Sequence, residues 1–405
     1  MGVTALRRAG KHLAAVGEKS CSERENILRR ALQNQKSSDF DVAFTFAYGT
    51  AKVQKKSVKC KKKRVLFVLD LVFRSLICTL AYGRKYFRSK KKRRKTSFPF
   101  AFSSLIRTFA PNFGNMVKRR WRCKPGQQPT EIDKRIMYLE NKGALVPTPD
   151  LIKTPEQIEG IRRAGVVNTG VLDAVGKEIC AGMSTLEIDQ ICRDYCALHG
   201  ATPACLNYGG DEETPPFPMS VCTSINEVVC HGIPKAEDIL EEGDIINVDF
   251  TTILDGYYAD ASRMFIIGKT TPEKEQLVRV TKECLEIGME AAKPWGFVND
   301  IGKAIQKHAN KYHYGVVRDL CGHGVGNAFH EDPEVAHFQQ KGNGMLLVPG
   351  MVFTIEPMIN MGTWKVFIDS EDPYGWEVVS DDELPSAQWE HTLLMTEHGV
   401  EVLSY

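Results

Sequence analysis

The chain of 405 residues contains no CxxC pair, and an apolar stretch at residues 65–82 is interrupted by Asp70 and Arg74. The twelve cysteines are scattered without the regular spacing of a secreted disulfide framework, which favours a reducing compartment in which thiols stay free. Because two charges fall inside the apolar stretch, no membrane span is expected there. The sequence is therefore typical neither of a disulfide-rich secreted protein nor of an integral membrane protein.

Acidic residues are scarce in the first 115 residues. This part has 27 Lys and Arg against 6 Asp and Glu, a net charge of +21, whereas the remainder has 26 basic and 44 acidic residues, a net charge of −18. The total of +3 hides this division into two kinds of sequence. Basic runs at residues 59–64 and 89–95 could bind ribosomal RNA or another polyanion through phosphate contacts. The scarcity of acids would also suit a transit peptide.

No capping or turn pattern predicts a fold in residues 1–115, and the string MVKRRWRCKPG from Met116 resembles the natural start of a protein. We therefore expect residues 1–115 to be a basic, disordered extension, a targeting segment or a mis-assigned start. Residues 116–150 would be a lead-in segment and residues 151–405 the folded, catalytic domain. A segment of that length can form one domain with an ample core.

Helix starts and strands recur in two similar sets after residue 151. Residues 154–157 (TPEQ) form a capping box that opens a helix, and residues 184–187 (STLE) open another. A strand pair is expected within residues 245–267, and then helices begin at residues 271–272 and 298. Further strands are expected near residues 316–320, 351–355, 391–396 and 400–403. Two halves in the order helix, helix, strands indicate an α/β (α+β) fold with pseudo-twofold symmetry.

The Asp255-Gly256 dipeptide predicts a two-residue hairpin turn between two β-branched strands. The turn would pair Asp249 with Ser262 and Asp260 with Thr251, so the two aspartates become diagonal neighbours on one face of the sheet. Diagonal Cβ atoms lie about 7–8 Å apart, which leaves room for a metal ion between the carboxylates.

Five potential metal ligands stand in distinctive short strings: Asp249 in INVDF, Asp260 in YADASRMF, His323 in CGHGVG, Glu356 in FTIEPM and Glu390 in SAQWEHT. Four carboxylates gathered in one place would repel, and each would tend to hold a proton. A pair of divalent cations removes this conflict and lowers the pKa of a bound water. Four oxygen ligands and one imidazole suit Mn, Fe(II), Co or Zn better than Mg, and the lack of a thiolate argues against a structural zinc site. The set predicts a hydrolase with two metal ions.

Six strings in combination resemble the type I methionine aminopeptidases: NEVVCHGIP, NVDF, DASRMF, CGHGVGNAFHEDP, FTIEPM and SAQWEHT. The resemblance spans about residues 204–403 and extends more weakly back to about residue 151. It implies the pita-bread fold, a pseudo-twofold arrangement of helices around a curved antiparallel sheet. It also implies removal of the initiator methionine from nascent chains and peptides whose second residue is small.

The resemblance also implies roles for the ligand residues. Asp249 should bind one metal ion through both carboxylate oxygens, and Asp260 and Glu390 should bridge the two ions. His323 and Glu356 should complete the other metal site.

Two further histidines match positions that the family uses without ligating metal. His330, in NAFHEDP, is suited to donate a hydrogen bond to the scissile carbonyl oxygen, and His231, in VVCHGIP, to contact the scissile amide or a proton in transit. Glu356 is the expected proton acceptor. His308, His313 and His337 lack such a context and are expected to be surface or packing residues.

By resemblance, six side chains would form a narrow apolar slot for the methionine side chain, which needs polarizable walls. They are Cys205, Tyr208, Phe217, Cys222, Phe329 and Trp376. The family pattern is interrupted by an acidic, proline-rich insertion at residues 211–216, expected to be an exposed loop, and by Met219 in place of a basic residue. Both changes affect the expected shape of the pocket mouth.

Three other functions are compatible with parts of this pattern. An Xaa-Pro dipeptidase or aminopeptidase P would share the fold and the five ligands, but VCHGIP and SAQWEHT favour methionine removal. A type II methionine aminopeptidase would carry a long insert between the last two glutamates, and here they are only 34 positions apart. A non-catalytic binding protein on the same scaffold would have lost ligands, and all five are present.

The expected partners are peptides and nascent chains with N-terminal methionine, and the protein is expected to be a monomer. A cytoplasmic location is expected, or an organelle if residues 1–115 are a transit segment. Some relatives carry an N-terminal zinc module, but the spacing of the upstream cysteines does not support one here. These are Cys21, Cys60, Cys78 and Cys123.

Overall fold

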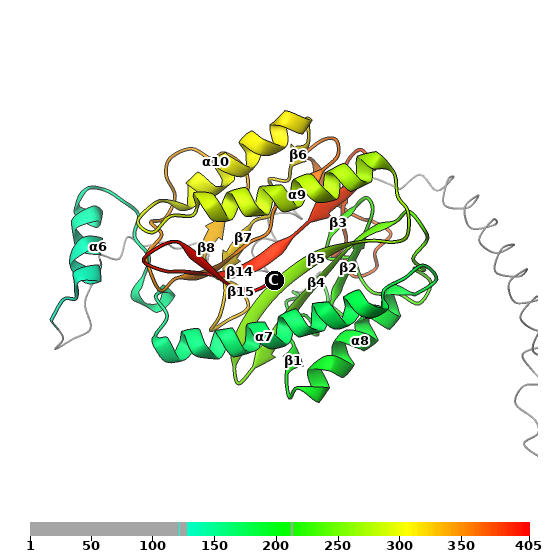
Figure 1. Cartoon of the computed structure of the whole chain (residues 1–405), viewed down its shortest axis with the longest axis horizontal. Coiled ribbons are helices and arrows are strands. Elements are labelled where there is room, and N and C mark those ends of the chain that lie inside the picture. The colour runs from blue at the N-terminus through cyan, green and yellow to red at the C-terminus, as the bar shows by residue number, and fades with distance from the viewer. Residues whose placement is uncertain (1–120, 122–127, 212–213) are drawn as a thin grey trace, which may run out of the picture. The chain divides into compact units, whose positions relative to one another are not determined.

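The computed structural model describes residue 121, residues 128–211 and residues 214–405, which all fall within one compact unit (Figure 1). The expectations for residues 1–115 and for Cys123 concern positions outside these described residues. Among the described residues, no helix has both the length and the apolar character needed to cross a membrane.

The central element is a nine-stranded sheet in which every pair of neighbouring strands is antiparallel. The strand order is β1-β4-β5-β14-β9-β7-β8, with β2 beside β4 and β15 beside β14. The strands are β1 (Thr202–Pro203), β2 (Cys222–Ile225), β4 (Ile245–Leu254), β5 (Tyr257–Ile266), β7 (Gly322–Gly324), β8 (Glu331–Val335), β9 (Val352–Ile355), β14 (Glu390–Met395) and β15 (Val400–Ser404).

Two small three-stranded sheets complete the β-structure of the described residues. One has the order β13 (Ser386–Gln388), β10 (Met358–Asn360) and β6 (Gly315–Val316), and the other β11 (Val366–Ile368), β12 (Val378–Ser380) and β3 (Val228–Cys230). The strand expected near residues 316–320 ends at Val316, and residues 318–320 line a cavity described below. Strands of two or three residues carry too little alternation to be seen in the sequence.

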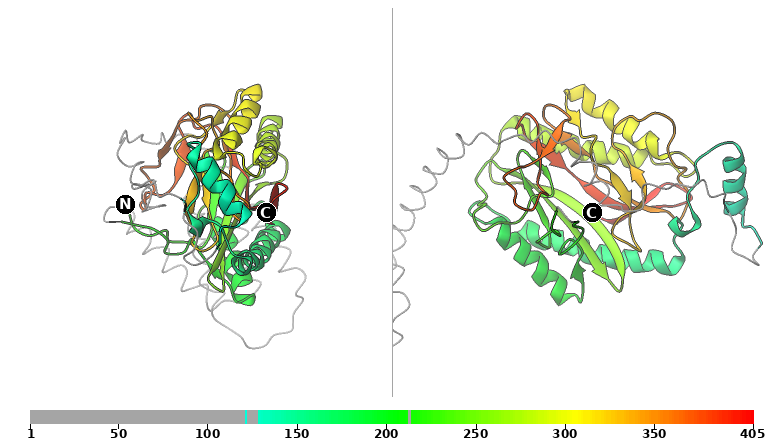
Figure 2. Two further views of the ribbon diagram at one scale, coloured as in Figure 1. Left: turned by 90° about the vertical axis from the view of Figure 1, so that its left-hand side faces the viewer. Right: turned by 180° about the vertical axis from the view of Figure 1, so that it is seen from behind.

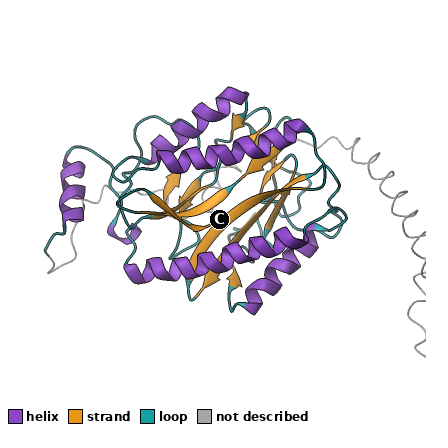
Figure 3. Cartoon of the chain, in the orientation of Figure 1, coloured by secondary structure: helices purple, strands orange, loops and turns teal. Residues whose placement is uncertain are grey.

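Four helices cover one face of the nine-stranded sheet in two pairs, α7 (Pro155–Glu178) with α8 (Thr185–Leu198) and α9 (Pro272–Ala291) with α10 (Val298–Ala309) (Figures 1 and 3). In the rear view the strands are seen from the other side (Figure 2). The pairs give the fold its pseudo-twofold character. The predicted α/β class with a curved antiparallel sheet and flanking helices is confirmed.

The helix starts lie where the capping patterns place them. Thr154 and Ser184 are N-caps of α7 and α8, and each forms a complete capping box with the residue three positions later. Thr271 caps α9, whose first residue is proline. Short 3-10 turns at Pro149–Leu151 and Asn310–Tyr312 precede α7 and follow α10.

Each helix pair packs its apolar face against its own half of the sheet. Under α7 and α8 lies a cluster that includes Leu172, Ile188 and Phe250, all with no exposed surface. Under α9 and α10 a larger cluster includes Leu277 and Phe353. Burial of such side chains stabilises the fold by about 1.5–3 kcal/mol each. The two clusters fix the sheet between two rigid supports.

The β4–β5 hairpin has the predicted register: Asp249 faces Ser262, and Thr251 faces Asp260. Asp255 adopts a positive φ of 52° and Gly256 one of 82°, as a two-residue type I′ turn requires. A slip of one residue would move both aspartates to the helix-covered face. The turn therefore decides which face of the sheet carries the acids.

The lead-in segment is attached to the catalytic unit. In α6 (Glu131–Asn141), Ile136 is fully buried in the cluster under α9 and α10. The Leu346 amide donates to the Leu145 carbonyl at 2.8 Å, and the Arg135 guanidinium lies 4.2 Å from the centre of the Trp295 ring. Residues 131–145 thus contribute to the core although they precede residue 151.

We expect a chain that begins at Met116 to unfold at the same temperature as the full chain, because every described helix and strand lies after that position. A chain that begins at Leu151 should unfold at a lower temperature, because it loses the buried Ile136 and the hydrogen bond to Leu145. Loss of one buried isoleucine side chain costs about 2–5 kcal/mol. Calorimetry of the three proteins measures this. Equal melting temperatures for the two shorter chains would contradict the role assigned to α6.

Candidate metal centre

Three of the predicted ligands lie on adjacent strands of the sheet at one level. Asp249 on β4 faces Ser262 on β5, and Ser262 faces Glu390 on β14. Paired residues point to the same face, and Asp260 shares this face because it is two residues from Ser262. The strand register alone brings three carboxylates together.

His323 on β7 and Glu356, just after β9, approach from the second half of the sheet. The Nε2 atom of His323 lies 3.8 Å from Oδ2 of Asp260 and 3.5 Å from Oε1 of Glu356. One ligand atom each of Asp260, His323 and Glu390 can be chosen so that all three lie within 4.8 Å of one another. The structure thus brings together the ligands predicted from five separate strings.

The tautomer of His323 matches a ligand of a cation. Its Nδ1 lies 2.9 Å from the Gly324 carbonyl oxygen, which can only accept, so Nδ1 carries the proton. Burial lowers the pKa of His323 to about 4, so the ring is neutral near pH 7. Its Nε2 lone pair then faces two carboxylates, an arrangement that is repulsive unless a cation lies between them.

The four carboxylates are also unfavourable in their charged form when no cation is bound. Burial, followed by the neighbouring carboxylates, raises the pKa values of Asp249, Glu356 and Glu390 well above the usual range, and burial raises that of Asp260 to about 7. Among the described residues, Oε1 of Glu390 is buried without a hydrogen-bond partner. Buried polar atoms are normally paired. A site of four carboxylates and one imidazole therefore fits divalent cations, with Mn, Fe(II), Co and Zn as the suitable metals.

Several hydroxyl and amide groups hold the ligands in place, and the sequence did not indicate them. The Thr251 hydroxyl donates to Oδ1 of Asp260 at 2.8 Å, and the Thr354 hydroxyl donates to Oε1 of Glu356 at 2.8 Å. The Gln388 amide donates to Oε2 of Glu356 at 3.2 Å. Thr354 on β9 lies two residues before Glu356, a spacing that directs both side chains to the same side of an extended chain and that could have suggested the contact.

His337 is another supporting residue that the sequence analysis set aside as surface or packing. It is 1% exposed, and its Nε2 accepts the backbone N–H of Glu356 at 3.0 Å. His308 instead pairs with Glu283 at 2.8 Å, away from the ligands, and His313 is exposed with a φ of 59°. Only His337 of the three touches the candidate centre.

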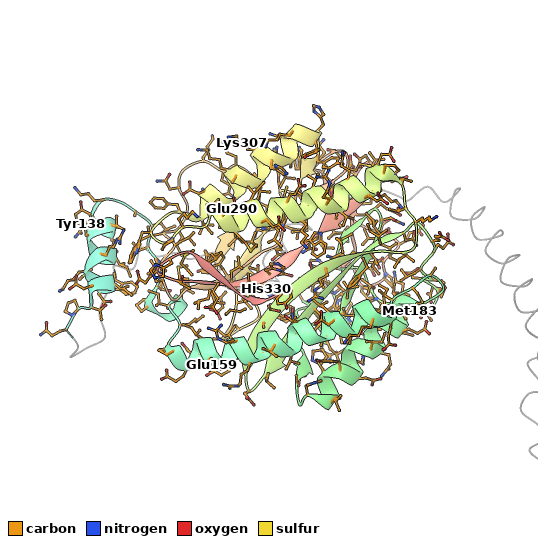
Figure 4. The ribbon with its side chains drawn as sticks, viewed as in Figure 1. Tyr138, Glu159, Met183, Glu290, Lys307 and His330 are labelled. Carbon is orange, nitrogen blue, oxygen red and sulfur yellow. The ribbon has the colours of Figure 1, made fainter. Side chains whose placement is uncertain are left out.

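The two histidines predicted to contact substrate line the same cavity as the ligands. The rings of His330 and His323 are 4.2 Å apart, and the Tyr208 hydroxyl lies 2.7 Å from Nδ1 of His330. Burial raises the pKa of Tyr208 and lowers that of His330, so the phenol stays protonated and the imidazole neutral. A hydroxyl that donates to Nδ1 leaves the ring proton on Nε2. His231 follows β3, has a positive φ of 57°, and has a pKa lowered to about 4 by burial. Figure 4 labels His330 near the middle of the sheet.

The six predicted pocket side chains line this cavity too, and they form one apolar cluster: Cys205, Tyr208, Phe217, Cys222, Phe329 and Trp376. Tyr208 and Phe329 have ring centres 4.6 Å apart, and Phe217 meets Trp376 edge-on at 5.7 Å. Met219 packs against the same cluster. An apolar, sulfur-rich and aromatic wall therefore stands directly beside the carboxylates.

The insertion at residues 211–216 takes part in this wall. Its Pro215 carbonyl accepts the indole N–H of Trp376 at 2.8 Å, and the Phe217 N–H donates to the Tyr208 carbonyl at 2.9 Å. Pro215 of the insertion thus contacts the pocket wall, and Pro215 and Pro216 are exposed as expected of a loop. The cavity is also lined by residues that the sequence did not suggest: Arg318, Asp319, Leu320, Glu334, Phe338 and Gln340.

Residues 159–397 match the family model of metallopeptidase family M24, and the chain belongs to this family. It is therefore a metal-dependent hydrolase. The relatives bear out the resemblance to methionine aminopeptidases. Methionine aminopeptidase A of a Synechocystis strain is 48% identical over 248 residues, which cover 61% of this chain and 94% of the relative. Methionine aminopeptidase of Escherichia coli K12 is 45% identical over 254 residues, 62% of this chain and 93% of the relative. The crystal structure of methionine aminopeptidase from Rickettsia prowazekii is 40% identical, with a TM-score of 0.59, and covers 63% of this chain and 99% of the other.

We expect the stabilisation by metal to grow as the pH rises. The pKa of Asp260 is about 7 in the folded protein and about 3.9 in an unfolded chain, so without metal the folded state holds the extra proton. The proton held by Asp260 therefore stabilises the metal-free folded protein at low pH, and this contribution is lost as the pH rises from about 4 through 7. Bound cations cancel this loss. Melting temperatures with chelator and with Mn²⁺, between pH 5 and pH 8, measure the difference.

Two carboxylate variants, one at a predicted ligand and one at a control position, test this expectation. Asp249→Asn should lose most of the metal-induced rise in melting temperature, while Glu290→Gln, an exposed position on α9 (Figure 4), should retain it. A metal-induced rise that is the same at every pH, or that survives in Asp249→Asn, would contradict this account of the centre.

Proposed function

We propose that the protein removes the initiator methionine from nascent proteins and peptides whose second residue is small. One observation carries the proposal. The five ligand residues, His231, His330 and the six apolar pocket residues all line a single cavity. A slot for a methionine side chain beside a hydrolytic metal site is the arrangement that this reaction needs. The chain covers almost the whole length of relatives named methionine aminopeptidase.

Two divalent cations would be held by Asp249, Asp260, His323, Glu356 and Glu390, with Asp260 and Glu390 between the two sites. When bound, such cations neutralise the acids and make a water molecule acidic enough to react near neutral pH. The ligand chemistry suits Co, Mn, Fe or Zn and does not distinguish among them.

Glu356 would accept the proton of the attacking water. Its two oxygens each accept a hydrogen bond, from Thr354 and from Gln388, and its backbone N–H is held by His337. These contacts fix the orientation of the carboxylate, as a positioned proton acceptor requires. The proton can then pass to the leaving amine, where His231 on the pocket wall can assist.

His330 would donate its Nε2 proton to the scissile carbonyl oxygen as negative charge develops there. With the Tyr208 hydroxyl as donor to Nδ1, the ring proton would lie on Nε2, and a neutral ring suits a hydrogen-bond donor that does not bind metal. Cys205, Cys222, Phe217 and Trp376 would contact the methionine thioether, which is polarizable like the walls around it.

We further propose that the protein acts in the cytoplasm as a monomer on chains with an N-terminal methionine. The basic residues before position 116 would add contact with ribosomal RNA or another polyanion, and this contact should weaken with salt. If those residues are a transit segment, the location would instead be an organelle.

The reaction is tested with a panel of peptides and several metals. The metal-loaded enzyme should release methionine from Met-Ala and Met-Gly peptides and spare Met-Lys and Met-Phe peptides, as the resemblance to methionine aminopeptidases implies. Release of free amino acids is measured by chromatography. Release of proline or an Xaa residue from Xaa-Pro peptides, without release of methionine from Met-Ala peptides, would assign the protein to the Xaa-Pro peptidases instead.

Two alanine variants separate ligands from substrate contacts. Asp249→Ala should lose metal and activity together. His330→Ala should retain its metal and lose about 10²–10³-fold in kcat, by analogy with the loss of one oxyanion donor. Metal analysis and steady-state kinetics on both proteins measure this. A His330→Ala enzyme with normal kcat would remove His330 from the mechanism.

A further inference from the structure

His330 lies in the turn between β7 and β8, and this turn has few backbone bonds of its own. The Gly326 N–H donates to the Ala328 carbonyl at 3.1 Å, the Val325 N–H donates to the Val352 carbonyl at 3.2 Å, and the Gly326 carbonyl accepts from the Tyr258 N–H at 2.8 Å. Gly326 has a φ of +136°, which few other residues adopt. A side chain must therefore supply much of the order that places the imidazole.

Glu331, the residue after His330, is the side chain that orders this turn. One carboxylate oxygen, Oε1, accepts the backbone N–H groups of Asn327 at 2.7 Å and Ala328 at 2.9 Å. The other, Oε2, forms an ion pair with the ammonium group of Lys153. The carboxylate thus closes the turn around Phe329 and His330 from inside.

Lys153 belongs to a distant part of the chain that is itself firmly held. Its N–H donates to the Gly350 carbonyl at 2.9 Å, and the next residue, Thr154, is the N-cap of α7. Its side chain is 1% exposed and that of Glu331 is 13% exposed. A buried ion pair of this kind is weak evidence for stability, but loss of one partner leaves an uncompensated charge in the protein.

The stem of Lys153 also fills the space beside the turn. A Cβ atom at Gly326 would lie 3.6 Å from Cε of Lys153 and 2.4 Å from Cδ1 of Ile161. The turn, Lys153 and the first turns of α7 are therefore packed without room for an added methyl group. The start of α7 and the imidazole of His330 are connected through one carboxylate.

We propose that Lys153 and Glu331 are positioning residues that set the location of the His330 ring, an inference that rests on the proposed role of His330. The ion pair holds the turn, and Tyr208 holds Nδ1 from the other side. Neither Lys153 nor Glu331 lines the cavity that contains the predicted metal ligands and pocket residues. A displacement of about 1 Å in a catalytic group can cost on the order of 10²-fold in rate.

The test uses the full chain loaded with Mn²⁺ and a Met-Ala peptide. Lys153→Met should lower kcat by about 10–100-fold with a change in KM of less than about threefold and normal metal content. Combined with His330→Ala, the same substitution should change the residual kcat by less than about twofold, because it acts through the imidazole. Melting temperatures confirm that each variant is folded at the assay temperature.

Two further variants test the charge itself. Glu331→Gln keeps a carbonyl oxygen for the two amides but removes the charge, and Lys153→Met combined with Glu331→Gln removes both charges. The double variant should recover part of the kcat lost in Lys153→Met, because no charge is left unpaired. If Lys153→Met does not fold, Glu331→Gln with and without His330→Ala decides the question. Arg162→Met, which breaks the half-exposed Arg162–Glu401 pair, is the matched control and should leave kcat unchanged.

Equal losses in kcat with and without His330 would overturn the proposal, because they would indicate a general structural effect. An unchanged kcat in both Lys153→Met and Glu331→Gln would overturn it as well. The wild-type assay distinguishes failure of the positioning role from failure of the proposed function. If the wild-type enzyme does not cleave Met-Ala peptides, the function fails, whereas wild-type cleavage with additive variants contradicts only the positioning role.

Discussion

The mutual repulsion of four carboxylates beside a neutral imidazole is the constraint on which this structure depends. Asp260, Glu356 and Glu390 are almost fully buried, and Asp249 is only partly exposed. Burial raises the pKa values of all four carboxyl groups, and the neighbouring carboxylates raise those of Asp249, Glu356 and Glu390 further. The strands keep the carboxylates close together despite this repulsion because two helix pairs and their cores hold the strands at fixed spacing. The cost of bringing the acids together is offset when cations bind, so folding and metal binding are coupled.

The sheet register turns this constraint into a site. The Asp255-Gly256 turn fixes the β4–β5 pairing, and the pairing of Glu390 with Ser262 adds the third carboxylate at the same level. Cys222 faces Asp249 across β2 and β4, so the apolar pocket begins one strand away from the ligands. Recognition of an apolar side chain and hydrolytic chemistry are adjacent because they occupy neighbouring positions of one antiparallel sheet.

Local patterns predicted the parts of the fold that depend on neighbouring residues. The capping boxes at Thr154 and Ser184 gave the helix starts, and the turn at Asp255 gave a register that the structure has. The ligands stood in strings whose combination is specific. What the sequence missed depends on contacts between distant residues. His337 supports Glu356 from 19 residues away, and Lys153 meets Glu331 across 178. No local pattern encodes such pairs, and strands of two or three residues carry too short a pattern to detect.

The most direct test of the account is anomalous diffraction at the manganese absorption edge, from crystals of the protein grown with Mn²⁺. The account predicts two peaks in the carboxylate cluster. Asp260 and Glu390 would contact both ions, Asp249 would contact one, and His323 and Glu356 would contact the other. Absence of anomalous density at these residues, with the acids instead protonated and hydrogen-bonded to one another, would contradict the claim that divalent cations hold this site together.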